Sequence, residues 1–578
     1  MTRRLLPTVA LTIAGALACA SPLAAQEVPP AKETALLSRT AAGGFPNGPS
    51  AQAAISGDRQ LASVTAFTSY ASDLTAGDTN GVSDVFAVRR YDPTADGLRG
   101  LPWRPAGPAQ LVSRGLGGAP ANGPSYAPDL DGDQLHDGLS GRVGPHCVAF
   151  VSAASNLVPG DTNGRPDAFV ADLRTGGIER VSVDSRGRQT RGTTTEVEVD
   201  GSCGRVAFVS DAPGLALTRP AYKRLRRPTA AAGLVTSAPR PGRRQAYVRV
   251  LKRSAEPDDA GLRGLTFLAS ASGGRAANAP SYDVALGQLG RSGDCRTKCS
   301  ITSGDAVAYT SEATNLSPSD RSGVPDVYKT SFARTYSKRG GRVTYAPVLR
   351  ATTLVSATRA GRGGNGPSRH PSLNPDGRWV AFATDATDVL PCVALQAGTA
   401  CDTGGLTDVA VVDTTARRIA AQWASASAAT GQPGNGPSER PSVTVYGSVF
   451  FDSDASNLQR QPASGGQFSD RNGFRDVFLW SVQTHSQSLQ SRNSDDAISY
   501  TAPSRQAEPS YSAALGASAP ATSAYNNYVV FESANVALDL PVAGSAFPDA
   551  LDDRSAAEAL AGADARAHQV YLRYVGRR

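Results

Sequence analysis

Three short sequence blocks recur in the same order along the chain, and this repetition constrains the fold more than any other feature. The second block is an apolar segment that ends in an aromatic residue, as in Val148–Phe150, and the third reads Asp-Val-Phe or a close variant, from Asp84 to Gln569. Each block occurs seven times, and the six intervals between Asp84 and Gln569 give a mean period of about 81 residues. The first block reads Asn-Gly-Pro-Ser and begins at Asn47, Asn122, Asn365 and Asn435, with looser copies at Asn278, Arg191 and Ala507.

Each repeat contains about four short segments in which β-branched and apolar residues lie between clusters of Gly, Pro and Asp, a pattern typical of strands. Four strands per unit, repeated radially, predict an all-β fold: a seven-bladed β-propeller of four-stranded blades. A linear solenoid is the alternative. We disfavour it because solenoid units of about 20 to 45 residues have tighter periods.

The two ends of the chain predict how the ring closes. The last repeat ends at its third strand, within 569–575, and no fourth strand follows it. At the other end, Thr34–Ser50 parallels Ala109–Ser125, so Ala35–Arg39 reads as a fourth strand without a blade of its own. We therefore expect this N-terminal strand to complete the last blade and to leave no unpaired sheet edge.

Residues 1–25 have the order of regions found in a secretory signal. Arg3 and Arg4 precede an apolar run from Leu5 to Ala18, and small residues extend to Ala25. We expect an exported protein, periplasmic or extracellular, that is cut near Ala25; lipid attachment at Cys19 is the less favoured alternative. A short linker over 26–34 and one propeller domain over 35–578 would follow, with an insert at 212–243 in the third repeat. No second stretch reaches the ~18 apolar residues of a transmembrane segment.

Cysteine number agrees with export, because the six cysteines beyond Cys19 are an even number. Local spacing favours two bridges and leaves the remaining two cysteines to pair over a longer span. A metal site is disfavoured, because the chain has no CxxC pair and its five histidines are scattered. The expected disulfides are Cys295 with Cys299, Cys392 with Cys401, and Cys147 with Cys203.

The blocks resemble those of the TolB-like, WD-repeat-like propellers of bacteria. The closest copy is Pro371–Phe382, which reads PSLNPDGRWVAF, and the resemblance covers about residues 35 to 575. It implies the fold and not an activity, since one fold hosts many functions. That family is usually six-bladed, and TolB has an α/β domain ahead of its propeller, so its role in the cell envelope is not implied here.

The loop before the third strand carries paired acids, with Asp at both ends in five of the seven repeats. Oxygen side chains spaced around a Gly resemble part of a calcium loop, but the acids that complete an EF-hand are missing. We therefore favour Asx-turns that stabilise the loop backbone, with calcium as the only cofactor considered. The candidate metal ligands are Asp78, Asn80 and Asp84; Asp161, Asn163 and Asp167; Asp320 and Asp326; and Asp470, Asn472 and Asp476, with a similar loop from Asp402 to Asp408.

A basic run from Arg219 to Arg253 replaces the acidic loop in the third repeat. Such a run is typical of a solvated, flexible loop. It could also contact an anionic envelope polymer or an acidic protein. Nucleic acid is disfavoured, because the insert contains only Tyr222 and Tyr247 as aromatic residues.

No catalytic motif occurs in the chain: there is no Gly-x-Ser-x-Gly elbow and no His-Glu-x-x-His helix. His370 is placed just before the first strand of the fifth repeat, where the axial mouth of a propeller would expose it. The sequence thus predicts a monomeric, exported binding or scaffolding module that is not an enzyme. The alternative is a hydrolase or lyase with its active site at the axial mouth, which perturbed titratable groups there would favour.

Overall fold

The computed structural model describes most of the repeat region and parts of the last repeat. The described residues are 34–58, 62–90, 105–132, 143–224, 234–255, 259, 262–287, 306–339, 342–395, 398–416, 419–427, 430–458, 475–491, 510–512, 528–533 and 569–574. Residues 1–33, which contain the proposed signal and Cys19, lie outside this set, as do Cys295 and Cys299.

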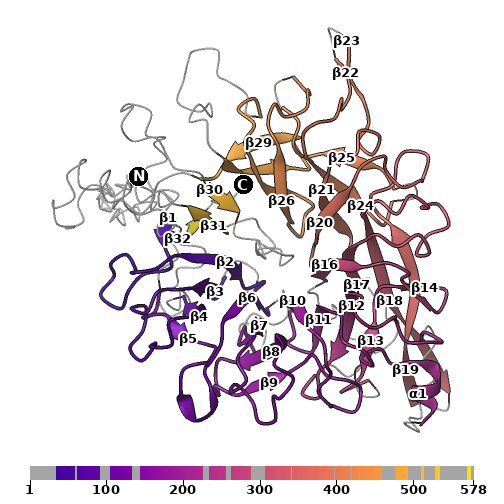
Figure 1. Cartoon of the computed structure of the whole chain (residues 1–578). Helices are drawn as coiled ribbons and strands as arrows, with labels where there is room; N and C mark the ends of the chain where they lie inside the picture. The colour runs from indigo at the N-terminus through magenta and orange to yellow at the C-terminus, as the bar shows by residue number, and fades with distance from the viewer. Residues whose placement is uncertain are drawn as a thin grey trace, which may run out of the picture.

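The described strands form seven four-stranded antiparallel sheets, which succeed one another around a central axis (Figure 1). This arrangement is a seven-bladed β-propeller, so the predicted fold class is confirmed. The innermost strand of each blade is the first one after the Pro-Ser of the first block. Helix is limited among the described residues to α1 (Arg219–Arg224) and the 3-10 turn η1 (Leu116–Gly118).

The strands of the first four blades are as follows. Blade 1 contains β2 (Ser50–Ile55), β3 (Val64–Ser69), β4 (Asp84–Arg89) and β5 (Gln110–Leu111), and blade 2 contains β6 (Ser125–Leu130), β7 (Cys147–Ser152), β8 (Asp167–Asp172) and β9 (Ile178–Arg180). Blade 3 contains β10 (Thr194–Val199), β11 (Arg205–Ser210), β12 (Gln245–Val250) and β13 (Thr266–Leu268), and blade 4 contains β16 (Ser281–Leu286), β17 (Ala306–Ser311), β18 (Asp326–Arg339) and β19 (Arg342–Leu354).

The remaining blades and two small hairpins complete the set. Blade 5 contains β20 (Ser368–Leu373), β21 (Trp379–Thr384), β24 (Asp408–Asp413) and β25 (Ala421–Trp423), and blade 6 contains β26 (Ser438–Val443), β27 (Val449–Ser453), β28 (Asp476–Ser481) and β29 (Ser486–Leu489). Blade 7 contains β30 (Ser510–Ser512), β31 (Tyr528–Ser533), β32 (Gln569–Tyr574) and β1 (Thr34–Leu36), and the hairpins are β14 (Ala271–Ser272) with β15 (Arg275–Ala276) and β22 (Val393–Leu395) with β23 (Gly398–Ala400).

The second and third sequence blocks become the two central strands of each blade, and their aromatic residues face each other. In blade 1, Phe67 of β3 is directly opposite Phe86 of β4, and the two rings stack with centroids 6.1 Å apart. The same pair occurs in blades 2, 3, 4, 6 and 7. Such cross-strand aromatic pairs stabilise a sheet beyond their burial, so the repeat fixes the register of every blade that has the pair.

The Asn-Gly-Pro-Ser block ties two loops of one blade together. The Asn47 side chain donates to Ser72 Oγ and accepts from the Ser72 amide, at 2.9 and 3.0 Å. Gly48 lies against the backbone of Tyr70 and Ala71, where an added Cβ would be only 2.9 Å from main-chain atoms. Only glycine fits this approach, which explains why the block recurs with Gly in most repeats.

The N-terminal strand closes the ring, as predicted. Strand β1 pairs antiparallel with β32, with Leu36 opposite Tyr571, so the first and the last strand of the chain lie side by side in blade 7 (Figure 1). Leu36 and Leu37 are buried, and Ser38 Oγ donates to Gln569 Oε1 at 2.7 Å. The closing segment therefore contributes both core packing and buried hydrogen bonds.

Two sequence-based expectations are wrong in the described residues. The run Arg219–Arg253 is not a uniformly solvated loop, because it includes α1, a buried Tyr222 and strand β12. Within β12, Arg249 is 1% exposed, and its guanidinium donates to Thr266 Oγ1 at 2.9 Å. His370 is the third residue of β20 rather than a residue before that strand.

Candidate functional site

The innermost strands that surround the propeller axis carry a bulge in blades 1 to 6. The pairing register shifts around the third residue of the strand in blades 1, 2, 4, 5 and 6, and at the second residue, Thr195, in blade 3. Bulges and positive φ in residues with side chains concentrate where a structure needs an unusual side-chain direction. The residues with positive φ at this place are Gln52 (53°), Ala127 (52°), Asp283 (52°), His370 (52°) and Arg440 (47°).

Polar side chains of the innermost strands link neighbouring blades. Gln52 Oε1 accepts from the backbone amide of Ala127 in blade 2 at 2.9 Å. The backbone amide of Gln52 donates to Glu532 Oε1 of blade 7 at 2.7 Å. Asp283 Oδ2 accepts from the His370 amide at 3.1 Å, which joins blades 4 and 5. These hydrogen bonds give the axial polar groups a structural role in holding the ring.

Blades 2 to 4 contribute a group of carboxylates near the axis. Glu196 Oε2 accepts from the Val284 amide at 3.0 Å. Burial, followed by the charge of Asp283, raises the pKa of Glu196 to about 7. Burial and the charge of Asp129 also raise the pKa of Glu198 well above its usual range. The Nδ1 atom of His370 in blade 5 is buried without a hydrogen-bond partner. Perturbed carboxyl groups near a histidine are one sign of acid–base chemistry.

Blade 6 presents the opposite charge, but its cations are already paired. Arg440 Nε lies 2.8 Å from Asp452 Oδ2. Arg475 contacts Glu439 at 2.9 Å and Asp454 at 2.7 Å. Charge pairs of this kind fix side-chain positions and leave little net field for a ligand.

In blades 1 and 2 the asparagine of the acidic loop accepts a hydrogen bond from an amide two residues on, as in an Asx-turn. Asn80 Oδ1 accepts from the Val82 amide at 3.1 Å, and its Nδ2 donates to Asp84 Oδ2. Asn163 makes the same contacts with Arg165 and Asp167, at 2.9 and 3.1 Å. The two acids of each loop lie close together. Burial is the main cause that raises the pKa of Asp84 and of Asp167, and the charge of Asp78 or Asp161 beside it adds to this effect.

In blade 4 both acids are buried, whereas in blade 5 Asp402 is half-buried and Asp408 is buried. Asp320 Oδ1 accepts from the amide and the hydroxyl of Ser322, at 3.1 and 3.0 Å. Asp320 and Asp326 are 1% and 0% exposed, and Asp326 Oδ2 has no hydrogen-bond partner. Asp402 Oδ2 in blade 5 is likewise without a partner. In blade 6, Asp476 is buried and accepts from Ser491 at 2.5 Å, whereas Asp470 and Asn472 lie outside the described residues.

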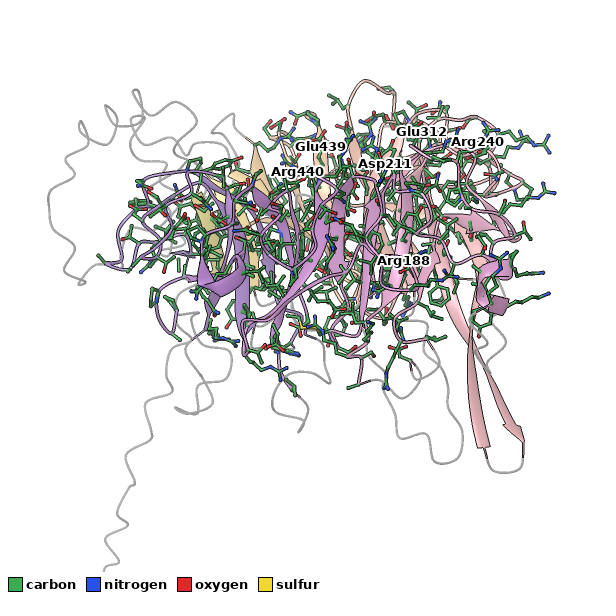
Figure 2. All side chains as sticks on the ribbon, turned by 60° about the horizontal axis from the view of Figure 1, so that its bottom comes forward. Arg188, Asp211, Arg240, Glu312, Glu439 and Arg440 are labelled. Atoms are coloured by element: carbon green, nitrogen blue, oxygen red, sulfur yellow. A yellow bond between two sulfur atoms is a disulfide. The ribbon has the colours of Figure 1, made fainter. Side chains whose placement is uncertain are left out.

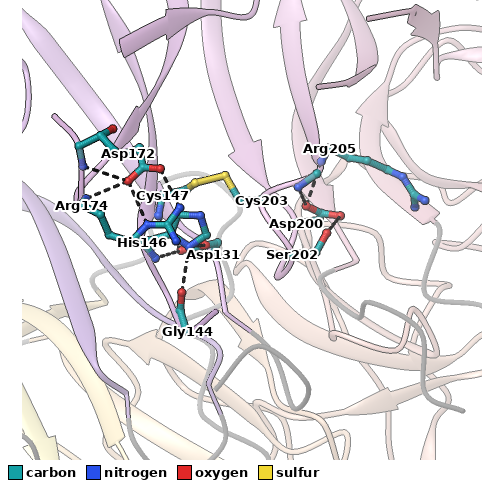
Figure 3. The surroundings of a disulfide bond; sticks show 12 residues. Asp131, Gly144, His146, Cys147, Asp172, Arg174, Asp200, Ser202, Cys203 and Arg205 are labelled. Carbon is teal, nitrogen blue, oxygen red and sulfur yellow. Dashed lines mark hydrogen bonds and ion pairs between the residues drawn. A yellow bond between two sulfur atoms is a disulfide. The ribbon is translucent and has the colours of Figure 1, made fainter. Parts of the chain in front are cut away.

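Two disulfides lie within the described residues. Cys147 of β7 is joined to Cys203 in the turn before β11, with a Cα–Cα distance of 6.1 Å, and Cys392 is joined to Cys401. Asp131 and His146 lie beside the first bridge (Figure 3). A carboxylate oxygen of Asp131, a ring nitrogen of His146 and the two sulfur atoms all lie within 4.8 Å of one another. Because the sulfurs are bonded to each other, they are not thiolate ligands in this state, and the bridge ties blade 2 to blade 3.

The insert of the third repeat carries a basic surface on blade 3, defined here by Arg219, Lys223, Arg224 and Arg240. All four side chains are exposed. Tyr222 of α1 packs in an apolar cluster with Leu217, Leu234 and Phe267, which anchors the insert to the blade. Figure 2 places Arg240 at the outer edge of the ring. The sequence signal that the insert is ordered is the set of apolar residues beside its charges, which a count of charges alone does not reveal. These residues are Leu217, Tyr222 and Leu234.

Sequence reasoning also missed the axial carboxylates Glu196, Glu198 and Asp283. Their signal is position: they follow the Pro-Ser block, or its degenerate copy, within the first strand. Asp283 lies within the bulge of β16, and Glu196 directly follows the bulge of β10, with Glu198 two residues further along that strand. A sequence reading that anticipated the bulge would have grouped them.

Comparisons with known proteins concern the fold alone. No protein-family model matches the chain, and no curated protein matches it. Among solved structures, it is similar to a putative TolB from Agrobacterium tumefaciens (12% identity, TM-score 0.30, 66% of this chain and 83% of that chain). It is also similar to an oligogalacturonate lyase from Vibrio parahaemolyticus (8%, 0.39, 92% of each chain) and to a puromycin-hydrolyzing peptidase from Mycobacterium tuberculosis (12%, 0.34, 80% of this chain and 49% of that chain). In the part of the chain that is described, no helix is long and apolar enough to span a membrane.

Proposed function

We propose that this propeller is an exported binding or scaffolding module, in the cell envelope or outside the cell, that holds an anionic partner at the basic surface of blade 3. The observation that carries the proposal is the anchored insert. Tyr222 and Leu234 are buried on the blade, while the guanidinium and ammonium groups beside them point to solvent. Cations on an ordered element lose less conformational entropy on binding than cations on a free loop.

The charges of this surface have no neutralising partner in the part of the chain that the structure describes. No ion pair of Arg219, Lys223, Arg224 or Arg240 occurs among those residues. The blade 6 cations Arg440 and Arg475, by contrast, contact carboxylates. Unpaired cations gathered on one face attract polyanions and acidic surfaces over roughly a Debye length. The overall charge of +7 acts in the same direction.

Two observations support export as part of this proposal. The protein contains the disulfides Cys147–Cys203 and Cys392–Cys401. Disulfides persist in oxidising compartments and are rare in cytosolic proteins. The order of charged, apolar and small residues over 1–25 is that of a secretory signal. Proteomic identification of the mature N-terminus would test this part directly.

A hydrolase or lyase at the axial mouth is the second candidate, and the pKa of about 7 at Glu196 favours it. Against it, Glu196 and Asp283 accept hydrogen bonds from the backbone of the next blade. A general base must be within reach of the substrate's proton, and these two carboxylates already hold the ring. Glu196→Gln should therefore lower stability without abolishing partner capture.

Replacing the four cations of the blade 3 basic surface with Gln should weaken partner capture by at least about tenfold, because each removes an unpaired charge. Capture from the envelope fraction of the source cell is measured with the mature chain as bait, at low and high salt. The melting temperature should change little, since exposed side chains contribute little to the core.

The matched control removes four exposed arginines elsewhere: Arg165, Arg186, Arg359 and Arg362. It lowers the net charge equally and should leave capture intact. If both quadruple variants lose capture equally, net charge rather than blade 3 recruits the partner. If neither does, the proposed binding surface is wrong.

A further inference from the structure

We propose that blade 4 binds a hard divalent cation, of which calcium is the best fit, between the carboxylates of Asp320 and Asp326. Two oxygens converge on one point there: a Cβ built on Gly363 would lie 3.0 Å from Asp320 Oδ1 and 2.7 Å from Asp326 Oδ2. The space in front of Gly363 is therefore a small cradle with a carboxylate oxygen on two sides.

Asp326 brings a buried oxygen without a partner into this cradle. Its side chain is 0% exposed, and Ser356 donates to Oδ1 at 2.5 Å, while Oδ2 has no hydrogen bond of ordinary geometry. Burial raises the pKa of Asp326, and the charges of Asp320 and Asp388 act in the same direction, whereas the Ser356 hydroxyl and the Gly364 amide lower it. A buried carboxylate oxygen left without a donor is costly unless a cation compensates it.

Blade 2 shows how the same pair of acids is satisfied by the protein itself. Arg180 Nη1 lies 3.2 Å from Asp161 Oδ1 and 3.5 Å from Asp167 Oδ2. Gln189 Nε2 donates to the same two oxygens, at 2.7 and 3.0 Å. The fold thus already places a positive charge between the two acids of this loop.

Blade 4 lacks both of these donors at the equivalent positions. Arg180 is opposite Phe169 in the blade 2 sheet, and Leu354 is opposite Tyr328 in blade 4. Gln189 forms an isolated bridge with Val183, and Gly363 forms the corresponding bridge with Ala357. Blade 4 therefore keeps the two carboxylates but has an apolar side chain and a glycine where blade 2 has a guanidinium and an amide.

Blades 3 and 7 support the same interpretation from the other side. Each has Gln where Asp326 would be, at Gln245 and Gln569, and neither amide leaves an unpaired charge. Gln245 donates to the Ala279 carbonyl at 3.0 Å and Gln569 to the Gly48 carbonyl at 3.2 Å. In these two blades the chain has a neutral residue in place of the second acid.

The ligand atoms indicate the kind of cation. All of them are oxygens, and calcium accepts carboxylate oxygens together with water in flexible geometry, whereas zinc prefers nitrogen and sulfur. Two carboxylates with water predict an affinity in the extracellular range, with Kd about 10⁻⁴ to 10⁻³ M. Tyr328 donates its hydroxyl to Asp320 Oδ2, so this tyrosine can sensitise the emission of terbium bound in place of calcium.

The test measures calcium binding by calorimetry and terbium emission excited through tyrosine, with the mature chain at about pH 8, where Asp326 is ionised. Gly363→Ala places a methyl group in the cradle and keeps both charges. Leu354→Arg with Gly363→Gln transplants the blade 2 donors. Each variant should lose one equivalent of calcium and most of the terbium emission, while Asp167→Asn in blade 2, the matched control, should lose neither.

The proposal is overturned if the wild-type chain shows no saturable binding up to about 10 mM calcium, tenfold above the weakest affinity expected here. It is also overturned if both blade 4 variants retain the wild-type stoichiometry and emission. A variant is used only if it unfolds cooperatively, which shows that it is folded. The two variants alter the site in different ways, so if one of them misfolds the other still decides the test.

Discussion

Deleting residues 34–39 should lower the melting temperature of the whole ring. This segment contains the outer strand of blade 7, and the chain continues from it into blade 1, so it joins the last blade to the first. The deletion removes two buried leucines, Leu36 and Leu37, and exposes the edge of β32. Loss of each such side chain costs about 2 to 5 kcal/mol. The buried Gln569 also loses the hydroxyl of Ser38. Differential scanning calorimetry of the truncated and full mature chains gives the measurement.

A peptide that covers residues 30–40 should restore part of the lost stability when added in excess, since a strand supplied in trans can complete an open sheet. The matched control peptide carries Ser in place of Leu36 and Leu37, and it should restore nothing. An unchanged melting temperature in the truncated chain would show that the closing strand is dispensable, contrary to the closure seen here.

The repeats were sufficient to predict the ring, because each block has one structural task. Phe67 and Phe86 face each other because their blocks form adjacent strands, and Asn47 with Gly48 joins two loops of one blade. The closure was predictable for the same reason, since Ala35–Arg39 repeats a fourth strand. Periodicity carries this information without any knowledge of long-range contacts.

The axial groups and the basic insert could not be predicted in the same way. Glu196 and Asp283 meet across two blades, and no local pattern specifies that distance. The insert was misjudged because its charges outnumber the few apolar residues, Leu217, Tyr222 and Leu234, that anchor it. The acidic loops recur in the sequence as one motif, whereas the difference of blade 4 depends on Leu354 and Gly363, which lie outside that motif.

The protein should be more stable at pH 5 than at pH 8. Burial raises the pKa of Asp58, Asp200 and Glu532 to about 7, although hydrogen bonds lower it in each case. In the unfolded chain these groups ionise near pH 4, so between about pH 4 and 7 the folded state binds more protons than the unfolded state. The free energy of unfolding must then fall as pH rises through this window and level off above pH 7. The expected loss is on the order of 2 kcal/mol per group.

Asp58→Asn tests the cause of this slope, because it removes a titrating group without changing the size of the side chain. The fold accepts an amide at the matching turn of blade 5, where Asn374 Oδ1 accepts from the Trp379 amide at 2.8 Å. The variant should be stabilised at pH 8 relative to wild type and show a shallower pH dependence of the unfolding free energy. Asp172→Asn is the matched control: contacts with Arg174 hold the pKa of Asp172 at about 2 despite burial, so it is ionised in both states across this window. A pH profile that is flat in wild type, or equally steep in Asp58→Asn and Asp172→Asn, would contradict the assignment of the slope to buried carboxyl groups.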